Sequence, residues 1–331
     1  MLRRILLTSA GAMALMGAAR AAEPLPPPPP PPPPIWTGFY VGVTAGAAWS
    51  NNASVSTAAT TFADSGLVDP LPAVSAGLAT GSWWVHPAGG FIGGATGGYN
   101  YQFSPSFVAG VELDFSGVVM NVKGPVVSRL AFIPGFPPDT LAQAISSSQN
   151  LDFLGTIRGR LGYLVTPTWL VYGTGGLAYG EVSAHTNLTQ FVSGPNAALI
   201  GLGANNPYYL VGFPACGSSA ITSTTAVNFP GTEPCGYSTT RVGWTAGGGF
   251  EWMFMPNWSI KLEYLYYHLG TANYTPGYLQ NPQLVSPPTV PFLYSNHVTS
   301  SASFNGNVVR IGLNWKFFTW PVPEAPVVAK Y

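Results

Sequence analysis

The chain has 331 residues, of which 47% are apolar, 13% aromatic and only 7% charged, with 12 basic side chains balancing 12 acidic ones. Soluble domains carry roughly 25% charged residues, so a surface that faces water everywhere is not expected. Nucleic-acid binding is excluded because the basic residues are few and matched by acids, and disorder is excluded because the apolar content is so high.

The N-terminus has the three parts of a secretory signal peptide, which is predicted over residues 1–21. Arg3 and Arg4 supply positive charge, residues 5–16 form an apolar core, and Ala-Arg-Ala at 19–21 is a small-residue cleavage pattern. The mature chain is therefore expected outside the cytoplasm.

A proline-rich periplasmic linker is expected next, over residues 22–36. The unbroken prolines at 26–34 predict an extended polyproline II rod that acts as a stiff spacer.

The mean hydropathy of +0.23 indicates a membrane protein. Beyond residue 20, however, no apolar run approaches the roughly 18 residues that a membrane-spanning helix needs. The other structure that pairs every backbone polar group inside hydrocarbon is a closed β-barrel, which the composition therefore predicts. A soluble β-sandwich is the structural alternative, but its outward face would be charged rather than apolar.

After the linker, side-chain polarity alternates with a period of two. In 107–119, for example, Val111 and Leu113 alternate with Glu112 and Asp114, which places one set in lipid and the other in the lumen. Eight strands are predicted, at 38–50, 90–103, 107–119, 151–165, 169–181, 240–255, 258–269 and 304–318.

The connections alternate in length, which is typical of outer-membrane barrels. Short turns lie at 104–106, 166–168 and 256–257, and long segments rich in Ser, Thr, Pro, Asn and Gly lie at about 51–89, 120–150, 184–239 and 270–303. The predicted fold is all-β: an eight-stranded antiparallel up-and-down transmembrane barrel over 37–318, with short periplasmic turns and four long extracellular loops. Residues 319–331 form a periplasmic tail.

Four segments carry a resemblance to a known family: WTGFYVG at 36–42, IRGRLGY at 157–163, GWTAGGGFE at 243–251 and VRIGLNWKF at 309–317. Together with the signal peptide and all eight strands, they resemble the small outer-membrane β-barrel proteins of alphaproteobacteria, the RopB-type or opacity-like surface proteins of the porin family. The resemblance implies a non-enzymatic integral protein of the Gram-negative outer membrane.

The resemblance also indicates partners and an assembly signal. The expected partners are the lipid and lipopolysaccharide of the outer membrane and the barrel-assembly machinery, with a periplasmic contact through the proline-rich segment as a further option. The assembly signal is predicted at Phe317, which ends the last alternating strand, rather than at the terminal Tyr331.

Eleven charged residues are predicted to face the barrel interior. They are Glu112, Asp114, Asp152, Arg158, Arg160, Arg241, Glu251, Lys261, Glu263, Arg310 and Lys316. One interpretation is a pore lining that sets selectivity; the other is a paired core that fills a barrel just wide enough for its own side chains. The second is favoured, because unpaired charges in so narrow a space are costly.

Catalytic, cofactor and metal sites are not predicted. The four histidines, His86, His185, His268 and His297, lie at or near the outer rim, where two or more could converge on a metal or haem or serve a hydrolase as base. No H-E-x-x-H motif, nucleophile elbow or spaced carboxylate pair accompanies them, so solvated loop histidines are the preferred interpretation.

The only two cysteines, Cys216 and Cys235, fall in the third long loop of an exported chain. A disulfide between them is predicted, with two free thiols as the alternative.

The predicted function is a structural and surface-display role in the cell envelope, without catalysis. The alternatives are a small porin that passes ions or solutes, a receptor or adhesin that uses the loops, and an enzyme whose catalytic groups converge at the rim.

Overall fold

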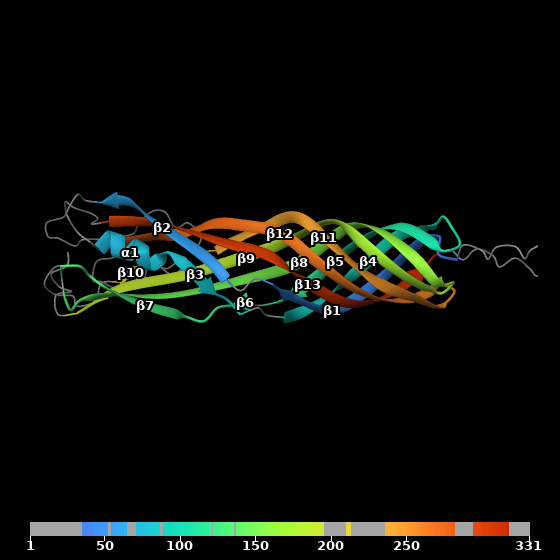
Figure 1. Ribbon diagram of the computed structural model, residues 1–331, viewed down its shortest axis with the longest axis horizontal. Helices are drawn as coiled ribbons and strands as arrows, with labels where there is room; N and C mark the ends of the chain where they lie inside the picture. The colour runs from blue at the N-terminus through green and yellow to red at the C-terminus, as the bar shows by residue number, and fades with distance from the viewer. Residues whose placement is uncertain are drawn as a thin grey trace, which may run out of the picture. The chain divides into compact units, whose positions relative to one another are not determined.

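The computed structural model describes residues 35–51, 54–64, 71–86, 89–120, 122–135, 137–194, 210–212, 236–281 and 294–317. Its strands form one antiparallel sheet, in which eight strands close into a ring in the order β1-β4-β5-β8-β9-β11-β12-β13, with β13 pairing back to β1 (Figure 1). The ring strands are β1 (Gly38–Ser50), β4 (Gly89–Gln102), β5 (Phe107–Val119), β8 (Thr140–Thr166), β9 (Trp169–Ser193), β11 (Gly236–Met255), β12 (Trp258–Asn281) and β13 (Tyr294–Lys316). The predicted antiparallel up-and-down barrel is confirmed.

Large apolar side chains cover the outside of the ring. Leu113 is 54% exposed, and neighbouring strands present Val43, Ile157, Leu177 and Ile311 in the same way. In a monomeric soluble protein such a continuous apolar surface would be a liability, whereas a barrel in lipid requires it. Among the described residues, no helix combines the length and hydropathy needed to cross a membrane.

The ring has two distinct ends. At one end, the turn end, short turns connect β4 to β5, β8 to β9 and β11 to β12. Both ends of the described chain also lie at the turn end. Leu164 N donates to Ser106 O, and Phe317 N donates to Phe39 O at 3.1 Å, which ties the last residue of the described chain to the first strand. The opposite end is called the loop end.

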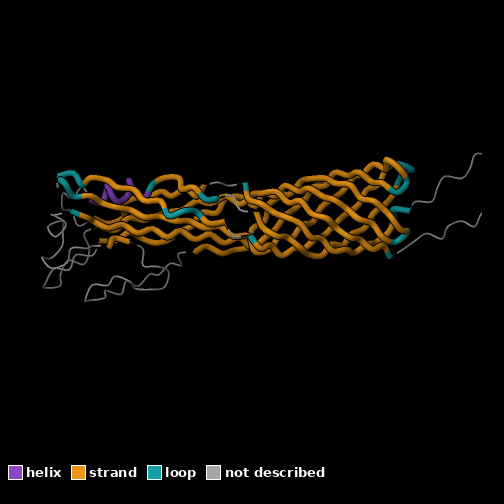
Figure 2. Tube along the Cα trace, turned by 90° about the horizontal axis from the view of Figure 1, so that it is seen from below, coloured by secondary structure: helices purple, strands orange, loops and turns teal. Residues whose placement is uncertain are grey.

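At the loop end the structure differs from the expected loops. β8, β9, β12 and β13 continue well past the ring, and the intervening segments add α1 (Leu71–Ala79) and five short strands (Figure 2). The short strands are β2 (Ser54–Asp64), β3 (Gly81–Trp84), β6 (Val122–Lys123), β7 (Val127–Phe132) and β10 (Leu210–Gly212). This part of the sheet is called the extension.

The extension has its own core, in which apolar and neutral polar side chains are mixed. The apolar ones include Leu141, Ile145, Leu188 and Val298, which pack around Leu78. The outward positions are mostly Ser, Thr and Asn. The predicted strands all have an apolar outward face, and these segments lack one, which is why the sequence predicts loops here.

Helix α1 packs inside the extension through polar contacts as well as apolar ones. The Ser75 hydroxyl donates to Gln190 Oε1 at 2.6 Å, and Gln190 Nε2 donates to Gln143 Oε1 at 2.8 Å. Deeper in, the Tyr274 hydroxyl lies 2.7 Å from the Thr186 hydroxyl, and burial raises the pKa of this phenol. The extension is therefore a packed structure rather than a set of open loops.

Candidate functional site

Strand register alone brings opposite charges face to face in the lumen. Because side chains of paired strands lie opposite one another on the same face, an acid and a base at paired positions meet without any loop to position them. The structure has three such cross-strand pairs: Glu112 with Arg158, Glu251 with Lys261, and Glu263 with Arg310.

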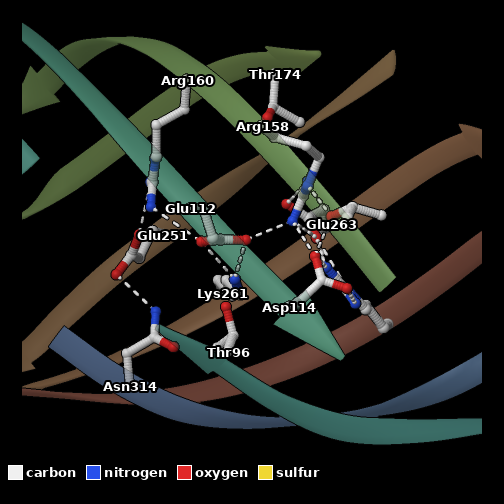
Figure 3. A network of polar contacts seen from close by, with 12 residues as sticks. Thr96, Glu112, Asp114, Arg158, Arg160, Thr174, Glu251, Lys261, Glu263 and Asn314 are labelled. Atoms are coloured by element: carbon white, nitrogen blue, oxygen red, sulfur yellow. Dashed lines mark hydrogen bonds and ion pairs between the residues drawn. The ribbon is translucent and has the colours of Figure 1, made fainter. Parts of the chain in front are cut away.

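Two arginines bind three carboxylates at one side of the lumen (Figure 3). Arg158 contacts Glu263 through Nη1 at 2.9 Å and Asp114 through Nη2 at 2.9 Å, and it also contacts Glu112. Arg310 donates from Nη1 and Nη2 to Asp114 at 3.1 and 3.0 Å and from Nε to Glu263 at 2.8 Å. Each guanidinium thus donates several hydrogen bonds to carboxylate oxygens. Its planar, forked arrangement of N–H groups matches the geometry of a carboxylate.

A second group lies closer to the turn end. Lys261 Nζ lies 2.8 Å from both carboxylate oxygens of Glu112, and the Tyr40 hydroxyl donates to Glu112 Oε2 at 2.6 Å. Arg160 donates to Glu251 at 2.7 Å and to the Tyr40 oxygen at 3.2 Å. Glu112, which also contacts Arg158, therefore links the two groups into one network, and Tyr40 joins it to Arg160.

Neutral side chains occupy the remaining carboxylate lone pairs. Ser259 and Asn314 donate to Glu251, Tyr172 donates to Glu263 at 3.1 Å, and Thr156 donates to Asp114. Tyr40 is a functional residue that the sequence analysis does not identify. Its position between the outward-facing Phe39 and Val41 in strand 38–50 is the signal that places its side chain in the lumen.

The network is electrically balanced and dry. Four acids pair with four bases, and none of these side chains is more than 2% exposed. Removing ions from water costs several kcal/mol for each ion, so only such complete pairing makes the arrangement tolerable.

Inward glycines provide the space for these long side chains. A Cβ at Gly98 would lie 2.6 Å from the Tyr40 hydroxyl oxygen, and one at Gly312 would lie 2.9 Å from Lys261 Cε. The glycine-rich strands are thus matched to the bulky residues opposite them.

A layer of buried apolar side chains lies at each end of the network. At the loop end the layer includes Ile92, Leu154, Leu265, Tyr267 and Phe304. At the turn end a smaller cluster gathers around Trp36, with Val108, Leu164, Leu170, Tyr172 and Met253.

Trp36, the last residue of the expected linker, is fully buried in that smaller cluster. Its indole Nε1 donates to Pro167 O at 2.8 Å, and its backbone N donates to Gln102 Oε1 at 3.3 Å. The chain therefore enters the barrel through the mouth of the lumen. No sequence motif distinguished Trp36 from the rest of the predicted linker.

Three of the eleven predicted interior charges lie outside the network. Lys316 is buried, with Nζ 3.9 Å from the centroid of the Trp36 ring. Arg241 is half-buried and donates to Leu269 O and the Tyr237 hydroxyl.

Asp152 requires a correction: it is exposed rather than interior. The pairing of β8 with β9 shifts register between Leu151 and Phe153, so a β-bulge reverses the inward and outward faces at this residue.

The remaining predicted residues are dispersed. His86 contacts the Trp84 ring, His268 lies beside Trp244, His297 lies 3.2 Å from the Thr275 hydroxyl, and His185 is exposed on β9. Within the described ranges, no group of three or more His, Cys, Asp or Glu side chains could hold a metal ion. Phe317 follows β13 and is partly exposed. Cys216 and Cys235 lie outside the described residues, as do 1–34 and 318–331.

Comparison with known proteins gives one family match. Residues 8–317 match the model of the outer membrane protein beta-barrel domain. The chain is also 28% identical over 324 residues to the 31 kDa outer-membrane immunogenic protein of Brucella melitensis biotype 1, which covers 96% of this chain and 100% of that protein. The protein of the same name from Brucella suis biovar 1 has the same identity and coverage.

Solved structures show more distant similarity. OprG from Pseudomonas aeruginosa is 12% identical with a TM-score of 0.36, over 85% of this chain and 97% of that one. Ail from Yersinia pestis is 10% identical with a TM-score of 0.25, over 83% of this chain and 99% of that one.

Proposed function

Because the chain belongs to the family of outer membrane protein β-barrel domains and is an outer-membrane protein, we propose that it is a closed structural barrel that displays its extension at the cell surface. In this proposal the turn end faces the periplasm, as short turns do in this class of barrel, and the loop end faces outward. The protein conducts no solute and catalyses no reaction.

The balanced network in the lumen is the observation that carries the proposal. Four acids and four bases, none more than 2% exposed, fill the middle of the barrel. A water path would have to separate these pairs, and each separated charge would then require its own solvation. The apolar layers above and below the network would oppose wetting as well.

The extension supports the display part of the proposal. Its apolar core and α1 give it an ordered interior, so it can hold the connecting segments at a defined distance from the membrane. Export would use the cleaved signal peptide at 1–21, and assembly would use the strand end at Phe317. The surrounding lipid and lipopolysaccharide are the partners in the membrane.

Electrical recording tests whether the lumen is closed. Refolded protein in planar bilayers is expected to give no steady conductance, and liposomes that contain it are expected to retain entrapped sugars. Protein unfolded by heat before addition serves as the control for leakage caused by damaged membranes. A steady, sugar-permeable conductance from the folded protein alone would overturn the proposal in favour of a small porin.

A further inference from the structure

The outward positions of the extension change chemistry sharply where the strands leave the lipid-facing belt. On β12 the belt residues Ile260 and Leu262 are exposed, whereas the outward positions further along the same strand are Thr271 and Asn273. β13 changes in the same way, from Ile311 and Val309 in the belt to Ser303, Ser301 and Thr299 beyond it. This surface is therefore continuous with the membrane interface.

Polar side chains on this surface form rows across several strands. Asn273 of β12 pairs with Ser301 of β13, Ser301 pairs with Ser56 of β2, and Ser56 pairs with Ser82 of β3. The hydroxyls of Ser56 and Ser82 lie 3.2 Å apart, and in the adjoining row those of Thr271 and Ser303 lie 2.8 Å apart. With strands about 4.8 Å apart, a four-residue row spans about 14 Å. The outward residues of these rows are called the neutral wall.

The neutral wall lacks formal charge, because no Asp, Glu, Lys or Arg occurs in 54–61, 270–277 or 296–303. On β8 and β9 the segments 140–150 and 182–190 are also uncharged, but Asp152 and Glu181 lie between them and the lipid-facing belt. Surfaces that face bulk water usually carry about 25–35% charged residues, which keep the protein soluble. The neutral wall is polar but uncharged, and it lies next to the lipid-facing belt. Such a surface is suited to contact with molecules that form hydrogen bonds and carry no charge.

Trp84 adds an aromatic surface at the edge of this wall. It lies on β3 opposite Ser54 and is 50% exposed, and its ring is tilted against that of His86 with 4.1 Å between the ring centroids. An indole ring presents an apolar face and a polar N–H, which suits the apolar and hydroxylated sides of a sugar ring.

We infer that the neutral wall contacts the uncharged sugars of the lipopolysaccharide molecules that surround the barrel in the same leaflet. Serine, threonine and asparagine each donate and accept hydrogen bonds, as sugar hydroxyls do, so the two surfaces pair without burying an uncompensated charge. The inference rests on the proposed function, because it needs the extension to stand on the outer side of the membrane.

The experiment uses the full refolded chain in nanodiscs that contain either lipopolysaccharide with its complete saccharide or lipopolysaccharide trimmed to its innermost sugars. Quenching of Trp84 by acrylamide is measured as the difference between the wild-type protein and Trp84→Phe. The complete saccharide is expected to reduce this quenching. Equal quenching in the two kinds of disc would overturn the inference.

Two variants separate contact from simple crowding by nearby sugars. Ser56→Asp places a charge in the centre of the row, and Ser56→Ala with Ser301→Ala removes two hydroxyls without adding charge. Both are expected to lose the protection of Trp84, whereas Thr168→Asp in a short turn at the opposite end keeps it. Protection that persists in both neutral-wall variants would contradict the contact.

Two further measurements identify the source of the sugar and keep the two proposals separate. Free saccharide, added to trimmed discs at the same overall concentration, is expected to give less protection than the lipid-linked form; equal protection would overturn the assignment to lipopolysaccharide. Conductance is recorded on the same preparations. A closed lumen without protection contradicts only the sugar contact, and a conducting lumen with protection contradicts only the closed barrel.

Discussion

Lys316 lies under the indole ring of Trp36, with its ammonium nitrogen 3.9 Å from the ring centroid. The ammonium has no hydrogen-bond partner among the described residues, so the face of the indole is its nearest favourable contact. The same ring caps the apolar cluster at the turn end. Trp36 thus shields the one buried interior cation that has no carboxylate partner within the described residues.

Trp36→Ala is expected to expose Lys316 and to lower the free energy of unfolding by about 3–5 kcal/mol, since a large buried ring is lost. Exposure is measured by acylating folded protein in detergent and locating the modified lysines by mass spectrometry. Lys316 should react in the variant but not in the wild-type protein, while the exposed Lys123 reacts in both. Trp84→Ala, on the extension, should leave Lys316 protected; reaction of Lys316 in the wild-type protein would contradict the cap.

Arg158→Met is expected to destabilise the barrel by about 3–5 kcal/mol, because it leaves four buried acids with only three buried bases. Denaturant unfolding of protein refolded in lipid vesicles measures this change. The matched control is Arg129→Met: Arg129 is exposed on β7 and covers the Trp83 ring at 4.2 Å. Its loss should cost no more than about 1 kcal/mol.

A double variant, Arg158→Met with Glu263→Gln, should recover part of the stability that Arg158→Met loses. Glu263→Gln restores the balance of the network to three acids and three bases, and so removes the desolvation cost of the excess buried charge. If the single and double variants are equally unstable, the network is not the origin of the effect.

Leu113→Arg is expected to destabilise the barrel by about 2–4 kcal/mol, because it places a charge among lipid chains near the bilayer midplane. The extension offers the same substitution in water: Leu130 on β7 is 71% exposed, compared with 54% for Leu113. Leu130→Arg should change stability by less than about 0.5 kcal/mol. Equal effects in a denaturant titration would show that the outer face of β5 does not lie in lipid.

Cys216 and Cys235 remain predicted to form a disulfide. Closing a loop of about 20 residues contributes on the order of 3 kcal/mol in the chain-entropy model. Non-reduced protein should therefore show no thiol that can be alkylated in mass spectrometry. Reduction should leave the barrel folded, because both cysteines fall in the predicted third long loop, outside the eight predicted strands. Two alkylated cysteines would contradict the bridge.

Local alternation was enough to predict the barrel itself. The predicted bounds 38–50 and 107–119 coincide with β1 and β5, and the predicted short turns lie between the observed strand pairs. Lipid imposes this regularity, because each residue of a spanning strand must face either hydrocarbon or the lumen. Side-chain polarity in such a strand therefore alternates with a period of two. Of the eleven charged residues that this alternation predicts to face the interior, eight lie in the lumen network.

The rest depended on contacts between residues far apart in the chain. The bulge that turns Asp152 outward is a property of how β8 pairs with β9, and a single sequence carries no mark of it. The extension lacks the apolar outer face from which the strands were predicted, and its inner face is filled by α1 from a different segment. Trp36 belongs to the predicted linker, and only the closed ring forms the mouth of the lumen in which its side chain is buried. Alternation along a strand determines which face each side chain occupies, but only the closed tertiary structure decides what lies opposite that face.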